Sequence, residues 1–534
     1  MGLTRGSGWG VALGFAMACW AGCGGGAADD AADTVDATDG LDAGINLPPT
    51  VDAGADQHVQ LPGASATFTA VAADADGSIA AVAWTVVSGG AATLAGADTA
   101  TVTLTDLAPG AYLLRATATD DRGATASDDV GLTVAPVDGA TYYMAPDGDD
   151  GNDGSLGAPW FSLERAWTAL TPGDTVYLRG GTYAYDNMQY LDGADGLVDA
   201  PIRVWAYPGE RPLITGAATY VFDDNNIDLI YFEGAYVHWK GLEIAYFDQA
   251  PGDPSWSAFR AGHAVGCVFE QLDYHHNAAS LSIRGDSTDN LVLNSDFHHN
   301  QDPYSKVPYD GADGLAIINN PGTGNLNTVR GCRAWWNADD GFDTWDNNGT
   351  VVFEDSWSML NGYIPDTLDE AGNGTGFKLG ISTAPQPDDV RRVLRRCVAM
   401  NNLKYGFVEN EAACQMQLDN CTSIGHGVFG YWFGAWGISQ PGSFRNNVSF
   451  GNAADEWHPD SVLQANSWQG GVSVSAADFV SLDVMALLAP RAEDGGLPVV
   501  DTARLAAGSD LIDAGADIGL PFDGDAPDLG AFER

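Results

Sequence analysis

The hexapeptide LDYHHN at residues 272–277 recurs in altered form six times along the chain, as SDFHHN (295–300), CRAWWN (332–337), SWSMLN (356–361), CVAMNN (397–402), CTSIGH (421–426) and NVSFGN (447–452). The last residues of successive copies lie 23, 37, 24, 41, 24 and 26 positions apart, and each of the two long intervals fits a single repeat that carries an insertion. Short apolar strands at this period indicate a parallel β-solenoid, whose coils stack about 4.8 Å apart. The sequence therefore predicts an all-β fold, with a parallel β-helix over residues 140–534.

The first positions of these copies form a column of mostly small residues, which we expect to face the interior as a ladder: Leu272, Ser295, Cys332, Ser356, Cys397, Cys421 and Asn447. Of the seven cysteines, two lie near the N-terminus and five lie between residues 267 and 421. An odd remainder argues against a disulfide framework in an exported protein. We therefore expect the ladder cysteines to be packed free thiols.

A four-residue slot recurs in five successive coils, with Gly at its second position: Asp313-Gly314-Leu315-Ala316, Asp340-Gly341-Phe342-Asp343, Thr375-Gly376-Phe377-Lys378, Tyr405-Gly406-Phe407-Val408 and His426-Gly427-Val428-Phe429. Its third position is always apolar and is predicted to point inward. The first and fourth positions then face outward. Asp313 is expected to stack beneath Asp340, and Asp343 beneath Lys378, about one strand spacing of roughly 5 Å apart.

These positions, with the adjacent Asp339, bring four carboxylates and one of only four lysines to a single patch. Carboxylates so close would repel one another unless a cation neutralised them, and oxygen ligands favour a hard ion, Ca2+ above Mg2+. A lysine beside a divalent cation is disfavoured in its ammonium form, so we expect the pKa of Lys378 to fall and its amine to act as a general base.

Length and charge restrict the partners of the protein. The 534 residues fit two to four domains, and 23 Lys and Arg against 72 Asp and Glu give a formal net charge of -49. Such a surface repels nucleic acid and anionic lipid headgroups. We expect no nucleic-acid partner, contact with a membrane only through a lipid anchor, and a monomer.

The N-terminus has the pattern of an export signal, with Arg5 ahead of an apolar stretch too short to cross a bilayer. The stretch ends in Trp20-Ala21-Gly22-Cys23-Gly24, which resembles a bacterial lipobox. We expect a signal peptide over 1–22 and lipid attachment at Cys23, with Cys19 and an ordinary signal as alternatives. Residues 23–46 read as a disordered acidic linker. The protein is then exported and either lipid-anchored at the bacterial cell envelope or secreted.

Residues 47–136 contain short alternating runs separated by Asp, Gly and Pro, which predict an antiparallel sandwich with Trp84 buried on a central strand. The segments PPTVDAGADQ, DADGSIAAVAWTVVSG and YLLRATATDDRGATASDDV resemble the PKD-like immunoglobulin fold. After this sandwich, a short helix near 162–170 is expected to cap the solenoid, and the last residues of the chain are expected to cap its other end.

The blocks DGLAI (313–317), GCRAWWNADDGFDTW (331–345), SWSMLNGY (356–363) and NGTGFKLG (373–380) resemble polysaccharide lyase family 9, the calcium-dependent pectate lyases on a right-handed parallel β-helix. The resemblance implies that Ca2+ is bound by Asp313, Asp339, Asp340 and Asp343 and that Lys378 is the catalytic base. It also implies β-elimination on an acidic polysaccharide such as polygalacturonate. Glu409 and Glu411 follow the next slot, where an anionic polymer would lie, and no substrate-binding residue is singled out.

Two other functions remain open from the residues. A polygalacturonase-like hydrolase would use Asp339 and Asp340 with Gly425-His426-Gly427, although the repeat places His426 about 14 Å, or three coils, from Asp340. A non-catalytic surface adhesin or carbohydrate-binding solenoid would keep calcium for stability alone, but it would have no use for Lys378. His275, His276, His298 and His299 form two stacked pairs, either a polar turn ladder or a transition-metal site.

Overall fold

The structure is a computed structural model that describes residues 46–534, except for 61–64, 136–138, 199, 221, 223–226, 248–256, 381–383 and 435–436. The expected signal peptide 1–22, the expected lipid-attachment residue Cys23 and all but the last residue of the expected linker lie outside the described residues. Within the described part of the chain, no helix is both long enough and apolar enough to cross a membrane.

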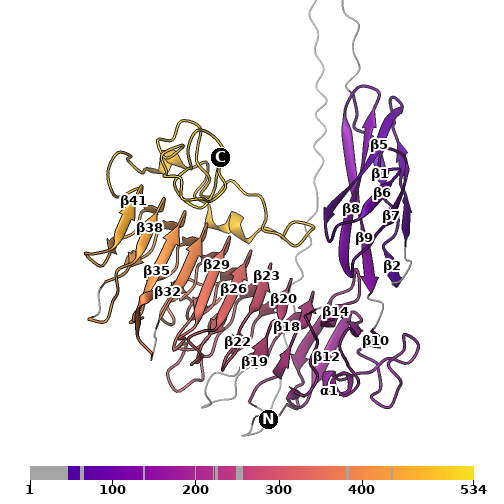
Figure 1. The fold of residues 1–534 in the computed structure, drawn as a ribbon, viewed down its shortest axis with the longest axis horizontal. Coiled ribbons are helices and arrows are strands. Elements are labelled where there is room, and N and C mark those ends of the chain that lie inside the picture. Colours follow the sequence, from indigo (N-terminus) through magenta and orange to yellow (C-terminus); the bar gives the residue numbers. More distant parts are fainter. Residues whose placement is uncertain are drawn as a thin grey trace, which may run out of the picture. The chain divides into compact units, whose positions relative to one another are not determined.

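Three long parallel sheets form the β-helix, and from β11 to β38 each strand pairs with the strand three positions later in the chain. The first sheet contains β10 (Thr141–Met144), β11 (Thr175–Leu178), β14 (Ile202–Ala206), β17 (Val237–Lys240), β20 (Val268–Glu270), β23 (Asn290–Leu293), β26 (Leu326–Arg330), β29 (Thr350–Glu354), β32 (Gln386–Arg395), β35 (Cys414–Asp419), β38 (Ser443–Arg445) and β41 (Val462–Gln464). Figure 1 shows these strands stacked in chain order.

The other two sheets have ten strands each. The second sheet contains β12 (Gly181–Tyr185), β15 (Pro212–Gly216), β18 (Glu243–Ala245), β21 (Asp273–His275), β24 (Asp296–His298), β27 (Arg333–Trp335), β30 (Trp357–Met359), β33 (Val398–Met400), β36 (Thr422–Ile424) and β39 (Val448–Phe450). The third sheet contains β13 (Gln189–Leu191), β16 (Ile230–Ala235), β19 (Ser257–Val265), β22 (Ala279–Ile283), β25 (Leu315–Ile317), β28 (Phe342–Asp343), β31 (Thr375–Lys378), β34 (Tyr405–Val408), β37 (Phe429–Trp432) and β40 (Ala454–Glu456).

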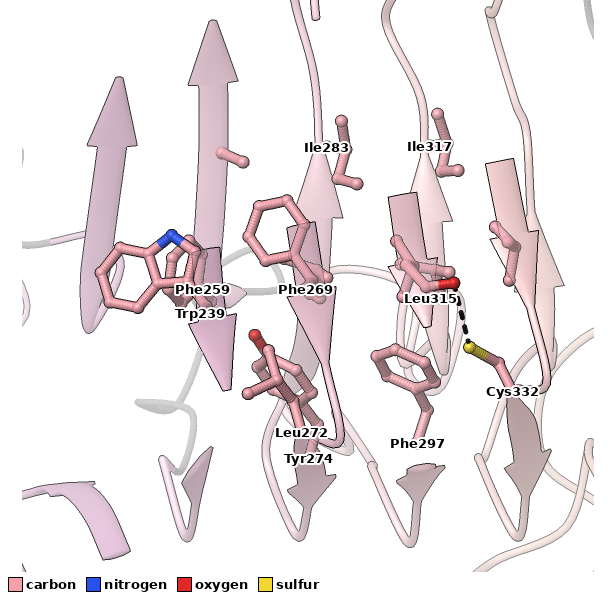
Figure 2. Close-up of a cluster of buried hydrophobic side chains, with 14 of the residues drawn as sticks. Trp239, Phe259, Phe269, Leu272, Tyr274, Ile283, Phe297, Leu315, Ile317 and Cys332 are labelled. Atoms are coloured by element: carbon pink, nitrogen blue, oxygen red, sulfur yellow. Dashed lines mark hydrogen bonds between the residues drawn. The ribbon is translucent and has the colours of Figure 1, made fainter. Parts of the chain in front are cut away.

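The interior is a continuous apolar column because alternate residues of every strand point inward. Figure 2 shows side chains from neighbouring coils side by side along the column, such as Tyr274 of β21 and Phe297 of β24, whose rings stack at 5.4 Å. Rings also stack along the third sheet, where the centroids of Phe342 and Phe377 are 4.9 Å apart. Burial of this column supplies the main favourable free energy of folding, at about 25 cal/mol for each Å² of apolar surface.

The last residues of the hexapeptide repeats form a buried ladder of hydrogen bonds at the end of the second-sheet strands. Asn337 Nδ2 donates to Asn361 Oδ1 at 2.9 Å, and Asn361 Nδ2 donates to Asn402 Oδ1 at 2.9 Å. His426 continues the ladder, since its Nδ1 accepts from the backbone N–H of Asn402 at 3.2 Å. These contacts confirm the repeat alignment, and they explain how buried polar turns are satisfied in every coil.

The buried cysteines of the described part of the chain are Cys267, Cys332, Cys397, Cys414 and Cys421, and the three ladder cysteines, Cys332, Cys397 and Cys421, are free thiols. The Cys332 thiol donates to the carbonyl of Val292 at 3.5 Å, and the dashed line in Figure 2 marks a bond of this thiol. Burial raises the pKa of Cys332 to about 12. The thiols are therefore packing groups, as the column of small residues predicted.

The N-terminal end of the column is covered by the short helix α1 (Leu163–Trp167), whose N-cap Ser162 accepts from the backbone of Arg165. Trp167 of this helix stacks on Trp239 at 5.7 Å. The helix therefore lies where the sequence predicted a cap. At the other end of the column, Trp457 and Trp468 stack at 4.5 Å and pack against the core.

The end of the chain lies elsewhere than the sequence predicted. Residues after 470, which include the 3-10 helices η1 (Ala476–Asp478) and η2 (Val484–Leu488), pack along the outer face of the second sheet. Leu487, Leu505 and Leu529 cover outward side chains of β27, β30, β33, β36 and β39. Those outward side chains are apolar, Trp357 and Met400 among them. The end of the chain therefore removes more apolar surface from water here than it would at the open end of the column.

The N-terminal part is an antiparallel sandwich of β1 (Thr50–Asp52), β2 (Gln57–Gln60), β3 (Ala66–Thr69), β4 (Val71–Ala73), β5 (Ile79–Ser88), β6 (Thr93–Ala95), β7 (Thr101–Thr105), β8 (Gly110–Asp120) and β9 (Thr125–Ala135). β2 is the exception, because it pairs parallel to β9. Trp84 is buried with Phe68 as predicted. Its strand β5 is not central, however, because it ends the order β2-β9-β8-β5.

Candidate functional site

The outward face of the third sheet carries the proposed site, and its register follows the predicted slot. Leu315 pairs with Phe342, and Phe342 with Phe377, so these apolar residues share one inward column. Asp343 pairs directly with Lys378 on the next strand. The predicted stacking of Asp343 beneath Lys378 is therefore found.

One slot was assigned wrongly. The sequence placed Val428 in the inward column, but Phe407 of β34 pairs with Tyr431 of β37, and Val428 is 38% exposed. The correct slot is Phe429-Gly430-Tyr431-Trp432, three residues further along. A glycine follows His426 in the turn as well, and this second Gly produced the error.

Four buried aspartates surround the amine of Lys378 from two coils. Carboxylate oxygens of Asp313, Asp339 and Asp340 lie within 4.8 Å of one another. Lys378 Nζ lies 3.0 Å from Asp340 Oδ2 and 3.2 Å from Asp343 Oδ2. The structure thus brings together all five residues that the sequence singled out. Asp343 is not one of the three aspartates whose oxygens lie within 4.8 Å of one another, and it joins the cluster through its contact with Lys378.

Backbone N–H groups hold the carboxylates in place. Asp339 Oδ1 accepts from Asn373 N at 2.5 Å, and Asp340 Oδ1 accepts from Thr375 N at 2.7 Å. Both donors belong to the segment that enters β31. This segment passes so close that a Cβ at Gly372 would overlap Asp339 Oδ1. Glycine is therefore required there by space.

The electrostatics of the cluster call for a cation. Burial, and then neighbouring carboxylates, raise the pKa of Asp313 and Asp339 well above the ordinary value. Asp313 Oδ1 is buried and accepts no hydrogen bond from the residues that the structure describes. Unpaired buried carboxylates cost several kcal/mol each unless a positive charge compensates. A hard divalent cation fits this set of oxygen donors.

Lys378 is held as an ammonium by the protein's own charges. Burial alone would lower its pKa, but Asp340 and Asp343 outweigh burial and raise the pKa well above the ordinary value. This direction is opposite to the one expected from the sequence. That expectation assumed a cation among the carboxylates, which would cancel the charges that now stabilise the ammonium.

A cleft of about 630 Å³ lies over this face of the third sheet. Arg284 lines it on one side of Lys378, and Tyr405 and Trp432 line it on the other. Burial and the nearby Arg260 lower the pKa of Arg284 to about 10. The sequence did not single out these three residues. Tyr405 holds the first position of a slot that the sequence aligned correctly, and Trp432 holds the fourth position of the slot that it misassigned, so only Trp432 was missed because of the register.

Two other candidate groups lie outside the cleft. Glu409 is buried and accepts from the backbone of Gly434 at 2.8 Å, so it does not face a polymer in the cleft. His426 is buried in the asparagine ladder, and burial lowers its pKa to about 4. It therefore cannot act with Asp340 as the acid and base of a hydrolase.

The fold and the site define a parallel β-helix protein with a cleft over one sheet and a lysine set among buried carboxylates there. A family model described as "Pel9A-like, right handed beta helix region" matches residues 142–455, and a second model, of a PKD domain, matches residues 53–134. The chain belongs to the Pel9A-like right-handed β-helix family, polysaccharide lyase family 9, and it carries a PKD-like domain before the β-helix.

Individual relatives agree with this assignment. "Pectate lyase L" of Dickeya dadantii (strain 3937) is 36% identical over 416 residues, which cover 74% of this chain and 90% of the relative. The crystal structure of pectate lyase Pel9A is 34% identical with a TM-score of 0.62, over 74% of this chain and 96% of that chain. A structure named rhamnogalacturonan lyase is 26% identical with a TM-score of 0.62, over 69% and 97%. The protein is a polysaccharide lyase, and the adhesin and hydrolase alternatives are set aside.

Proposed function

We propose that the protein cleaves a pectate-like polyuronate by calcium-dependent β-elimination, with Lys378 as the base. The observation that carries this proposal is the position of Lys378 Nζ, 3.0 Å from Asp340 and 3.2 Å from Asp343, at the cleft. A structural calcium site has no need of a lysine. A base that works beside carboxylates needs their charge to be neutralised.

The ligands of the calcium would be Asp313, Asp339, Asp340 and Asp343. When bound, Ca2+ would attract the C6 carboxylate of a uronate and make the C5–H more acidic. The three backbone-anchored aspartates are already held in place before any ion binds, because Asn373, Thr375 and Trp345 donate to them. This arrangement reduces the reorganisation that binding requires.

Lys378 would act as its neutral amine. Nζ takes the proton from C5, and the electron pair of the C–H bond forms the C4=C5 double bond. The bond from C4 to the glycosidic oxygen breaks at the same time or next, and the departing oxygen takes a proton from water. The products are a new chain end and an unsaturated uronate. No water adds across the broken bond, which distinguishes this reaction from hydrolysis.

The substrate is proposed to be a polymer of galacturonate, because several relatives are named pectate lyases. Rhamnogalacturonan is the second candidate, since one solved relative carries that name. Arg284 on one side of Lys378 suits a uronate carboxylate, and the rings of Tyr405 and Trp432 on the other side suit the face of a sugar.

Ultraviolet absorbance of the unsaturated product tests the proposal. Purified protein with Ca2+ is expected to raise this absorbance on polygalacturonate or on rhamnogalacturonan, and an excess of chelator is expected to abolish the increase. New reducing ends without absorbance would indicate hydrolysis and would overturn the proposal. Activity that survives the chelator would overturn the role of calcium.

We also propose that the protein is exported, acts as a monomer, and is attached to the cell envelope through a lipid at Cys23. The motif ending at Cys23 and the acidic tether after it support this location. An envelope enzyme on a tether would meet large polymers that cannot enter the cell.

A further inference from the structure

The cleft over the third sheet runs along the stack of coils and crosses seven strands, from β19 to β37. Its lining residues begin at Ser257 of β19 and end at Trp432 of β37. Lys378 of β31 lies inside this span, with four of the strands before its own and two after it. A polymer in the cleft therefore continues past the base on both sides, and side chains far from Lys378 can contact it.

Small side chains form the floor of the cleft on the coils before Lys378. Ser282 of β22 pairs with Ala316 of β25. Ala316 pairs in turn with Asp343, and Asp343 pairs with Lys378. These residues form one outward column, so Ser282 lies three strand spacings, or about 14 Å, from Lys378. The serine and the alanine leave room above them for a chain of sugars.

Arg284 follows directly after β22 and lies over this floor. Residues two apart along a strand point to the same face, so Arg284 is on the side of Ser282. Arg284 Nε donates to Ser282 Oγ, and Arg284 lines the cleft. Its guanidinium is therefore held near Ser282, about three strand spacings from Lys378.

The guanidinium of Arg284 has no anionic partner within the part of the chain that the structure describes. No carboxylate there forms an ion pair with it, and its Nη atoms make no hydrogen bond. The neighbouring Arg260 is paired, with Nε 2.9 Å from Asp228 Oδ2. Burial, and then the charge of Arg260, lower the pKa of Arg284 to about 10. These surroundings disfavour the cation, so a bound anion would stabilise it.

Arg284 is also the cation that the cleft leaves free for a ligand. Of the described residues that line the cleft, only Arg284 and Lys378 are cationic. Lys378 already lies 3.0 Å from Asp340 and 3.2 Å from Asp343. An anionic polymer in the cleft thus meets one cation that its own carboxylates can pair with.

We propose that Arg284 binds the carboxylate of a uronate about three sugar residues away from the one that loses its proton. This inference rests on the proposed function, because it takes the polymer to be a polyuronate. A 1,4-linked uronate residue is about as long as one strand spacing of about 4.8 Å, so three spacings correspond to three residues of the polymer. A guanidinium pairs with a carboxylate through two parallel hydrogen bonds, and a methyl ester loses the charge that strengthens them.

The spacing sets the length that a substrate needs to reach both sites. A trimer of galacturonate spans two residue intervals and a hexamer spans five. Only the hexamer therefore extends from the calcium cluster to Arg284. The subsite makes the enzyme prefer long substrates over short ones, and it makes that preference depend on one side chain.

The test measures kcat/KM for hexagalacturonate and for trigalacturonate with Ca2+, from the absorbance of the unsaturated product. Arg284→Gln should lower kcat/KM for the hexamer at least about tenfold, mainly by raising KM, and should affect the trimer much less. Arg284→Lys keeps the charge without the planar fork and should lose less than Arg284→Gln. Arg211→Gln is the matched control, since this arginine is 78% exposed before β15 of the second sheet, and it should keep both wild-type values.

Ser282→Ala is a second, milder variant that removes the acceptor of Arg284 Nε. It should lower kcat/KM for the hexamer in the same direction by a smaller factor, and thermal unfolding shows that each variant is folded. Equal losses on the hexamer and the trimer, or no loss on either, would overturn the subsite and leave the proposed function standing. No unsaturated product from the wild type on either oligomer would instead overturn the proposed substrate, and the subsite with it.

Discussion

Asp343 is the residue whose titration links calcium to stability. Burial, with help from the charge of Asp340, raises its pKa to about 6 against the opposing effect of Lys378. An acid with a raised pKa holds its proton more tightly in the folded state. Its contribution therefore favours the fold below its unfolded pKa of about 3.9 and is lost as the pH rises through about 6.

A cation should reverse this loss, because it compensates the carboxylates once they are ionised. We predict that Ca2+ raises the unfolding temperature more at about pH 7.5 than at about pH 5. Differential scanning calorimetry with Ca2+ or with chelator measures both shifts. Asp343→Asn should reduce the difference between them, whereas Asp346→Asn, a neighbouring acid outside the cluster, should not. Equal shifts at both pH values would contradict the link.

At the scale of single residues, the sequence alone identified the cluster residues because they occupy fixed positions beside a Gly-apolar pattern. These residues are Asp313, Asp339, Asp340, Asp343 and Lys378. Arg284 could not be found in this way. It follows the end of β22, outside any slot, and only the path of the chain brings it to the cleft. The direction of the pKa of Lys378 also depended on knowing that Asp340 and Asp343 lie within 3.2 Å.

Among the structural elements, the asparagine ladder is the one that a single substitution should destabilise most. Buried Asn361 donates to Asn402 Oδ1 and to the carbonyl of Ala334, and it accepts from the backbone and side chain of Asn337. Asn361→Ala would leave these buried partners unsatisfied, at about 1–3 kcal/mol for each group. We predict a loss of about 3 kcal/mol or more in the free energy of unfolding.

Urea denaturation measures this loss, and Asn187→Ala, at an exposed position, is the control that should change stability by less than about 0.5 kcal/mol. Equal stability of the two variants would show that the ladder does not hold the coils. Helix content cannot be used to follow unfolding here, because the fold is nearly all β.

The elements also explain why the sequence repeat was aligned correctly with most coils and misaligned in one. The inward aromatic residue comes five positions after Asn337, Asn402 and His426, at Phe342, Phe407 and Tyr431. Counting from the ladder would have avoided the error at Val428. Insertions after Asn300 and Asn361 hide this interval in two coils, and the strands there are found only from their hydrogen-bonded register.

On the scale of the whole molecule, the sandwich and the β-helix were both predictable because their periodicities differ. The path of the last 60 or so residues was not, because they contain no strand after β41, in a stretch that the structure describes throughout, and so no periodic pattern to follow. They follow the apolar outer face of the second sheet, a surface that exists only once the coils are stacked.

The proposed lipid anchor is also a property of the whole molecule. We predict that the full-length protein, expressed in a bacterium, fractionates with membranes, and that Cys23→Ser moves it to the soluble exported fraction because the acylated thiol is lost. Cys19→Ser is the matched control and should remain with membranes. Release by Cys19→Ser with retention of Cys23→Ser would place the anchor at the other cysteine.

The central claim is that Lys378 removes a proton beside a calcium-filled aspartate cluster. The most direct measurement is kcat for formation of unsaturated uronate by Lys378→Ala at saturating Ca2+ and substrate, with exposed Lys306→Ala as the control. Loss of a general base lowers a rate by about 100- to 10,000-fold. We predict a fall in this range for Lys378→Ala with calcium binding retained, and no change for Lys306→Ala. A Lys378→Ala enzyme that keeps its kcat would contradict the account.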